Sequence, residues 1–244
     1  FGDGFARAFD ITFTGKDNTL HYPHQTSWGV STRMIGGLIM THGDNNGLVL
    51  PPRIAPTQVM VIPVAQHKEG VLEAATALLE RLKAAGLRAK MDASDQSMGW
   101  KAAEYEMKGI PLRVEIGPKD MEKNQCVLVR RDSGEKVFIS LDELETAVPA
   151  TLDAIHDGLY QRAKKNLEDH IFAAHSLEEA KALQAQHGGF IKTMWCGDEA
   201  CEIKMKEEGG MTSRCVPFAQ EHLGDTCPIC GRAAKKMIYW GVAY

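Results

Sequence analysis

The sequence has 244 residues, a formal net charge of −4 and 44% hydrophobic residues, enough chain for two compact units or three small ones. Its 25% of charged residues is ordinary for a globular protein and excludes disorder, collagen or a coiled coil as the main state. The slightly acidic balance argues against non-specific nucleic-acid binding. No window approaches the ~18 apolar residues of a membrane span, so we expect a cytoplasmic protein with no membrane partner.

The first stretch, residues 1–53, predicts a hairpin followed by an apolar helix. Polar and apolar residues alternate in the first strand, and Gly and Asn mark the turn. The helical run is apolar, rich in small residues and free of proline, which favours a buried helix. The predicted elements are a strand at 9–13, a turn at 15–18, a return strand at 21–27, a helix at 32–42, a turn at 43–47 and a strand at 48–50. The proline-rich segment 51–56 predicts a domain boundary.

The second stretch, residues 54–155, alternates strands with helices, which predicts an α/β unit with a mostly parallel sheet. Gly86 fits the position that follows a helix end. The predicted strands are 58–63, 88–91 and 112–116, followed by a hairpin of 127–131 and 136–140. The predicted helices are 68–85, 99–108 and 141–159.

The third stretch, residues 156–244, predicts a small α+β domain, which makes the chain α/β and α+β with several domains. A polar helix is expected at 162–172 and another at 176–186, where Ser176 is the expected N-cap and Glu179 follows three residues later. A last strand is expected at 237–240.

Four of the six cysteines form two close pairs, Cys196 with Cys201 and Cys227 with Cys230. Four thiolates in a tetrahedron are the usual structural zinc site, and Gly197 beside the first pair lets the backbone wrap an ion. Four protein ligands leave no open position, so this metal would be structural. Buried free thiols are the alternative.

The other two cysteines are expected to have packing roles. Cys126 is interpreted as a small hydrophobic residue at the edge of a strand. Cys215 lies between the pairs, where it is either a substitute ligand or, as we favour, part of the core.

The densest polar stretch is residues 26–33, between a strand and the apolar helix. Trp28 can form an apolar wall and Gly29 permits close approach of a ligand. Ser31 precedes the helix N-terminus, a natural anion site, and the fork of Arg33 suits phosphate. A capped helix with a solvent-exposed arginine is the alternative.

Residues 26–44 and 47–52 resemble motif 3 of class II aminoacyl-tRNA synthetases, and more narrowly the archaeal/eukaryotic type of prolyl-tRNA synthetase. Residues 5–10 are similar to a further segment of that family, residues 109–120 to its anticodon-binding signature, and the cysteine pairs to its C-terminal zinc module. The chain also ends in Tyr244, as members commonly do. The resemblance implies three parts: the end of a class II catalytic domain (1–53), an anticodon-binding domain with a mixed sheet (54–155) and a zinc-binding domain (156–244).

The resemblance also implies residue roles. Arg33 would be catalytic and hold the ATP γ-phosphate, Ser31 would contact ATP, and Trp28 and Gly29 would line the proline pocket. The residues expected to read the anticodon are Glu106, Arg113 and Lys136. The expected zinc ligands are Cys196, Cys201, Cys227 and Cys230. The alternative for Glu106 and Arg113 is a surface ion pair.

Arg130 and Arg131 are expected either at backbone phosphate or at an exposed strand end. The family gives His24 and His42 no role, and we interpret both as structural.

The implied activity is that of a proline–tRNA ligase, a homodimer that uses ATP and Mg²⁺ to form prolyl-adenylate and then charges proline tRNA. The chain starts at Phe1, and motifs 1 and 2 are not in it, so we expect a fragment that is inactive alone. A non-catalytic RNA-binding or interaction module with structural zinc is the main alternative, and a proline-specific paralogue that edits or regulates is another.

Overall fold

The computed structural model describes residues 1–243, and these residues form two compact units. Among the described residues, the first unit consists of residues 1–50 and 54–138, and the second of residues 51–53 and 139–243. The last residue, Tyr244, which is one of the points of resemblance to the synthetase family, lies outside the described residues. Within residues 1–243, no helix is both long enough and apolar enough to cross a membrane.

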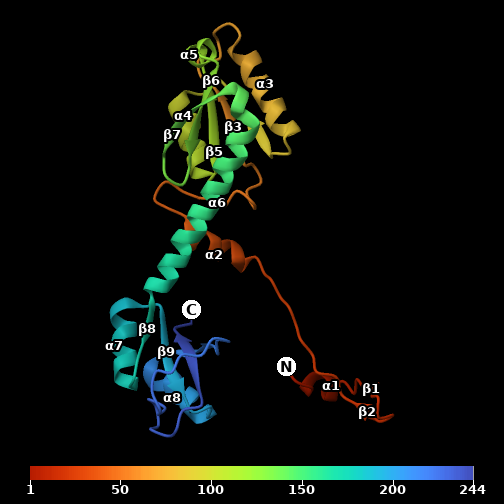
Figure 1. Cartoon of the computed structure of the whole chain (residues 1–244), viewed down its shortest axis with the longest axis vertical. Coiled ribbons are helices and arrows are strands. Elements are labelled where there is room, and N and C mark those ends of the chain that lie inside the picture. Colours follow the sequence, from red (N-terminus) through yellow and green to blue (C-terminus); the bar gives the residue numbers. More distant parts are fainter. Residues whose placement is uncertain (244) are drawn as a thin grey trace. The chain divides into compact units, whose positions relative to one another are not determined.

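The N-terminal segment contains a short helix and a very short hairpin (Figure 1). Helix α1 spans Gly4–Ala8, and strands β1 (Phe13–Thr14) and β2 (Leu20–His21) pair antiparallel. The hairpin is confirmed, but the strands predicted at 9–13 and 21–27 are wrong in extent. Asp10 has a left-handed φ of 52°, which an extended strand does not permit. The amide of Ile11 instead bonds the carbonyl of Ala6 and closes the end of α1.

Helix α2 (Arg33–His42) is confirmed, but its predicted burial is wrong. None of its residues is buried, and Met34 and Met40 are 68% and 80% exposed. Apolar composition predicts a face that can be buried, whereas burial itself needs a second surface against that face.

The predicted strand at 48–50 is also wrong. The amides of Leu48 and Leu50 instead donate to the carbonyls of Met107 and Gly109, at the end of the helix that spans Met98–Met107. These partners belong to a helix end and not to a strand, so no ladder forms.

The first unit is built on a five-stranded sheet in the order β4-β3-β5-β6-β7. Its strands are β3 (Val59–Pro63), β4 (Ala89–Met91), β5 (Leu112–Ile116), β6 (Gln125–Arg130) and β7 (Lys136–Ser140). Strand β3 pairs parallel with β4 and β5, and β5 pairs antiparallel with β6. The sheet is therefore mixed, and all these strands agree with the sequence prediction to within two residues.

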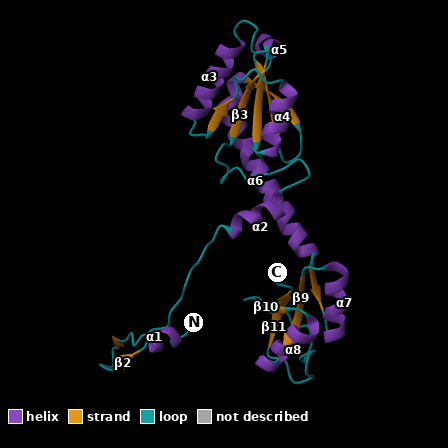
Figure 2. Ribbon diagram, turned by 180° about the vertical axis from the view of Figure 1, so that it is seen from behind, coloured by secondary structure: helices purple, strands orange, loops and turns teal. Residues whose placement is uncertain are grey.

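Helices α3 (Val71–Ala84) and α4 (Met98–Met107) flank this sheet (Figure 2). The chain passes from β3 through α3 to β4, then back through α4 to β5 on the other side of β3. Because parallel crossovers are right-handed, the reversal of direction puts the two helices on opposite faces. Gly86 ends the α3 region with φ of +80°, as predicted, and a short helix α5 (Pro118–Glu122) precedes β6.

The face of the sheet under α4 combines apolar and charged residues. Met60 and Ile62 of β3 pack with Ile110, and partly buried Tyr105 of α4 covers them. In the parallel register Met60 lies beside Arg113 and Ile62 beside Glu115. Adjacent positions share a face, so β5 carries two charged residues beneath α4.

The second unit begins with one long helix. A 3₁₀ turn (Leu141–Glu143) leads into α6 (Leu144–Asp169), which continues through the region where two helices were expected. The prediction of two separate helices is therefore wrong, because no glycine or proline in residues 159–169 interrupts the helix. The helix ends before β8 (Ile171–Ala173), which pairs parallel with β9, a tertiary contact that a local pattern does not reveal.

The rest of this unit is a four-stranded sheet in the order β10-β11-β9-β8 with helices α7 and α8. The bounds are α7 Leu177–His187, β9 Phe190–Trp195, α8 Glu199–Gly209, β10 Thr212–Cys215 and β11 Lys236–Gly241. Ser176 caps α7 by accepting from the amide of Glu179, as predicted. The core centres on fully buried Trp240, whose indole N–H donates to the hydroxyl of Thr193 at 2.9 Å.

Candidate functional site

The four paired cysteines meet at one point of the second unit. Their sulfur atoms all lie within 4.8 Å of one another, and Cys196, Cys201 and Cys227 are buried. Cys196 follows β9 and Cys201 lies in the first turn of α8. Cys227 and Cys230 flank a tight turn in which the amide of Gly231 bonds the carbonyl of Cys227. Gly197 and Gly231 have φ of +85° and +74°, the left-handed geometry that glycine tolerates best.

The spacing of these sulfurs fits a tetrahedral ion. Sγ of Cys196 lies 3.6 Å from that of Cys201 and 3.8 Å from that of Cys230. Zinc–sulfur bonds of ~2.3 Å in a tetrahedron separate the sulfurs by about 3.8 Å. The cluster is therefore able to hold a metal of zinc size with little movement of its side chains.

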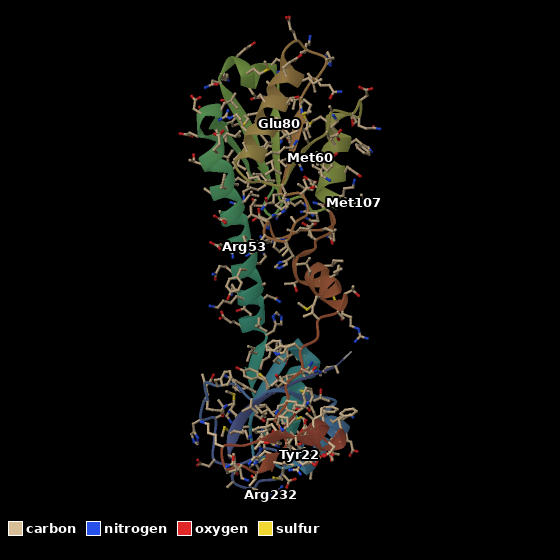
Figure 3. The ribbon with its side chains drawn as sticks, turned by 90° about the vertical axis from the view of Figure 1, so that its right-hand side faces the viewer. Tyr22, Arg53, Met60, Glu80, Met107 and Arg232 are labelled. Carbon is tan, nitrogen blue, oxygen red and sulfur yellow. The ribbon has the colours of Figure 1, made fainter. Side chains whose placement is uncertain are left out.

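Arg232 is the residue at this cluster that the sequence analysis missed (labelled in Figure 3). Its guanidinium donates to Sγ of Cys230 at 3.3 Å and to the carboxylate of Asp198 at 2.6 Å. Hydrogen bonding from Arg232 lowers the pKa of the Cys230 thiol to about 6, whereas burial raises the pKa of Cys201 to about 12. Its position two residues after the second cysteine pair, in Cys-Pro-Ile-Cys-Gly-Arg, is the sequence feature that could have predicted its contact with the cluster.

The remaining cysteines differ from each other. Cys126 is fully buried in β6, as expected, and burial raises the pKa of its thiol to about 12. Cys215 is exposed at the end of β10, so the favoured core-packing role is wrong. The strand pairing is irregular between Ser213 and Cys215, and such a bulge redirects a side chain.

Glu106 and Arg113, predicted to read the anticodon, lie in direct contact. Arg113 Nη1 is 3.1 Å from Glu106 Oε1, and Arg113 Nε is 3.4 Å from Glu115 Oε1. The side chain of Arg113 is only 7% exposed, whereas that of Glu106 is 36% exposed. The pair is therefore a half-buried network beneath α4 and not a surface ion pair, and Glu106 is its accessible member. Lys136 is exposed at the start of β7.

We predict that Arg113→Ala destabilises the first unit by about 3–5 kcal/mol, because it leaves the buried carboxylate of Glu115 without its cation. Urea unfolding of the two proteins measures the difference. The double variant Arg113→Ala/Glu115→Ala should recover part of the loss. A change below ~1 kcal/mol for the single variant would mean that the pair behaves as an exposed one.

Arg131 is too buried to contact the phosphate backbone of a nucleic acid. It is 6% exposed, and its guanidinium holds both oxygens of Asp44 at 2.7 and 2.6 Å and donates to the carbonyl of Glu106 at 2.8 Å. Arg130 forms a similar fork with Asp132 at 3.0 and 2.8 Å. The prediction that Arg131 lies at an exposed strand end or at phosphate is wrong, because Asp44, far away in sequence, supplies its partner.

The Asp44–Arg131 pair predicts an acid-sensitive stability. Hydrogen bonding from Arg131 lowers the pKa of Asp44 from 3.8 to about 2. A lowered folded-state pKa gives stability that is present above the unfolded-state pKa near 4 and is lost as the pH falls through the folded-state pKa of about 2. Thermal unfolding of the native chain and of Asp44→Asn should therefore differ at pH 5 and converge below pH 2. An equal difference at both values would contradict the assignment.

The segment 26–33 is exposed throughout. Trp28 is 94% exposed, so it walls no closed pocket within the described residues 1–243. Ser31 Oγ accepts a bond of 3.4 Å from the amide of Arg33, the first residue of α2. The structure thus places Ser31 and Arg33 together at a helix N-terminus, where a phosphate is favoured.

Residues 58–151 match the family described as "Anticodon binding domain", and residues 177–244 match "Prolyl-tRNA synthetase, C-terminal". The first match defines the class of this part of the chain: residues 58–151, which contain most of the mixed sheet and its flanking helices, form an anticodon-binding domain. The second match narrows the class of protein, because its model describes the C-terminal domain of prolyl-tRNA synthetases. The resemblance of the sequence to prolyl-tRNA synthetases is thereby confirmed.

Curated relatives extend the similarity to all 244 residues. The chain is 58% identical to "Proline--tRNA ligase" of Lachnoclostridium phytofermentans, 57% to "Proline--tRNA ligase 2" of Bacillus thuringiensis (strain Al Hakam) and 55% to "Proline--tRNA ligase" of Clostridium novyi. Each alignment covers 100% of this chain and 51% of the relative. The chain thus spans about half the length of the curated relatives it matches.

Proposed function

We propose that the full-length protein is a proline–tRNA ligase, which joins proline to ATP as prolyl-adenylate and transfers the prolyl group to proline tRNA. The observation that carries this is the presence, in one chain, of an anticodon-binding domain and a C-terminal domain of prolyl-tRNA synthetase type. A non-catalytic RNA-binding module is less well supported, because the relatives that match the whole chain are named as ligases. A homodimer in the cytoplasm belongs to the same proposal.

In this proposal α2 contributes to the ATP site. Arg33 holds the γ-phosphate and Ser31 contacts the nucleotide, both at the exposed start of the helix, where the dipole also favours negative charge. Trp28 and Gly29 line the proline pocket. Mg²⁺, when bound to ATP, neutralises charge on the phosphates. The carboxylate of proline attacks the α-phosphate of ATP and releases pyrophosphate. The terminal hydroxyl of the tRNA then attacks the prolyl carbonyl of the adenylate and releases AMP.

Anticodon reading is assigned to the first unit. Glu106 is half-exposed at the end of α4 and suits the N–H donors of a guanine edge. Arg113 is too buried to offer its whole fork, so it takes part in base reading by orienting the carboxylate of Glu106, to which its Nη1 donates. Exposed Lys136 adds a cation for base or phosphate.

The test is Glu106→Gln in the full-length enzyme, which keeps the size of the side chain and removes its charge. Loss of a base contact worth ~1–3 kcal/mol should lower kcat/KM for tRNA charging about 10- to 100-fold. Proline-dependent pyrophosphate exchange without tRNA should not change.

Glu104→Gln is the matched control, since Glu104 lies on the same helix and pairs with Lys108 at 2.6 Å. Equal losses in both assays for Glu106→Gln would assign Glu106 to folding. No loss in either assay would refute its role in reading the anticodon.

The cysteine cluster is assigned to structural zinc. The support is the soft thiolate set, the sulfur spacing near that of a tetrahedral site, and the absence of an open ligand position once all four cysteines bind.

A further inference from the structure

The end of helix α4 is held by groups from two distant parts of the first unit. The last carbonyls of an α-helix have no regular partners within the helix. In α4 the carbonyl of Glu106 accepts from Nε of Arg131 at 2.8 Å, and the carbonyl of Met107 accepts from the amide of Leu48 at 3.0 Å. Arg131 follows β6, and Leu48 follows the turn after α2. The helix end that carries Glu106 is therefore fixed from outside the helix.

The guanidinium of Arg131 bridges this helix end and the turn at residues 44–47. Its two Nη atoms hold both carboxylate oxygens of Asp44 at 2.7 and 2.6 Å, while its Nε donates to the carbonyl of Glu106. The side chain of Arg131 is only 4% exposed, and a planar guanidinium presents its donors in a fixed geometry. The two bonds to Asp44 therefore set the direction in which Nε points. A cation at the C-terminus of a helix is also favoured by the helix dipole.

The turn and the helix end pack backbone against backbone. Gly47 has a φ of +128°, and a Cβ atom there would lie 2.6 Å from the Cα atom of Met107 (labelled in Figure 3). Gly109 has a φ of +70°, and a Cβ atom there would lie 2.7 Å from the carbonyl oxygen of Leu48. Carbon atoms in favourable contact are about 3.5–4.0 Å apart. A displacement of the turn toward α4 would therefore displace the residue next to Glu106.

Glu106 is thus held at both its backbone and its side chain. Arg131 fixes its carbonyl, and Arg113 donates to its carboxylate at 3.1 Å. A recognition group works best when a further set of contacts presets its position, and a displacement of about 1 Å costs as much as ~100-fold in enzyme rates. The contacts of Arg131 are therefore of the kind that a base-reading carboxylate needs.

We propose that Arg131 and Asp44 are positioning residues for anticodon reading, which set the place of Glu106 without contacting the tRNA. The inference rests on the role proposed above for Glu106. Arg131 is buried and its Nε, Nη1 and Nη2 atoms are all engaged within the protein, so it acts through the helix end. Asp44 belongs to the part of the chain assigned to the catalytic domain, and that part therefore contributes to a specificity determinant of the anticodon-binding domain.

The test is Arg131→Met in the full-length enzyme, alone and combined with Glu106→Gln. Alone, it should lower kcat/KM for charging of proline tRNA about 10-fold, the effect of one lost hydrogen bond of a charged group. Proline-dependent pyrophosphate exchange without tRNA should not change. In the Glu106→Gln background the further loss should stay below about 2-fold, because residues that act through one another are not additive.

Two further variants keep the side chains of the network in place or nearly so. Arg131→Lys keeps the cation and loses the fork, so its loss should be smaller than that of Arg131→Met. Gly47→Ala leaves the bridge intact and forces the turn against Met107, so it should lower charging and again have little effect in the Glu106→Gln background. Thermal unfolding of each protein confirms that it is folded under the assay conditions.

Arg88→Met is the matched control. Nε of Arg88 donates to the carbonyl of Ala55 at 2.9 Å, the same kind of bond, and Arg88 precedes β4, which lies on the other side of β3 from β5. This variant should charge tRNA like the native enzyme.

Equal losses for Arg131→Met in the native and Glu106→Gln backgrounds would overturn the inference and assign Arg131 to folding alone. An equal loss of pyrophosphate exchange, or no loss of charging, would also overturn it. The proposed function fails in a different way: Glu106→Gln by itself would then leave charging unchanged.

Discussion

Replacing Cys201 with serine should remove the metal and unfold the cysteine-rich module of the second unit. Cys201 is 3% exposed and its sulfur lies within 4.8 Å of the other three. A hydroxyl does not replace a thiolate ligand, and binding of structural zinc contributes about 10–16 kcal/mol in small modules, as much as the whole stability of many domains. Zinc content by mass spectrometry and thermal unfolding of the chain measure the two effects.

Cys215→Ser is the matched control, because Cys215 is exposed and lies outside the cluster. It should keep one zinc per chain and the native unfolding temperature. The same chain treated with a strong chelator should reproduce the unfolding of Cys201→Ser. A zinc-free protein that melts like the native one would show that the cysteines are buried thiols without a metal.

Arg33→Ala in the full-length enzyme should lower the rate of proline-dependent pyrophosphate exchange about 100- to 1,000-fold. A preorganised donor to developing charge contributes ~2.7–4 kcal/mol to a transition state, and Arg33 is an exposed cation at the start of α2. Binding of proline tRNA should stay nearly native, because it is assigned to the anticodon-binding domain. Exchange kinetics and filter binding measure the two properties on one protein.

Lys83→Ala serves as a control, since Lys83 is an exposed cation on α3 that pairs with Glu80 at 2.9 Å. Arg33→Lys should fall between the native enzyme and Arg33→Ala, because a lysine keeps the charge and loses the fork. An unchanged exchange rate in Arg33→Ala would refute its role at ATP, and with it the assignment of residues 26–33 to motif 3.

The local pattern of residues in the sequence was sufficient to predict most strands of the sheet in the first unit. Strand β5 begins and ends where the apolar run predicted it, and β3 and β4 begin one residue later than predicted. The cysteine cluster followed from spacing alone, because each pair is close enough in sequence to chelate from one loop. Such features depend on neighbours within a few residues, which the sequence displays directly.

Contacts between distant residues decided the rest. Arg131 resembles Arg130 in sequence, yet Asp44, 87 residues away, binds it and buries it. Strand β8 exists because it pairs with β9. The sequence by itself thus determined the sheet of the first unit, the cap of α7 and the cysteine cluster. Only the tertiary structure decided which charges are buried and which apolar faces stay exposed, because burial depends on the surface that another segment brings.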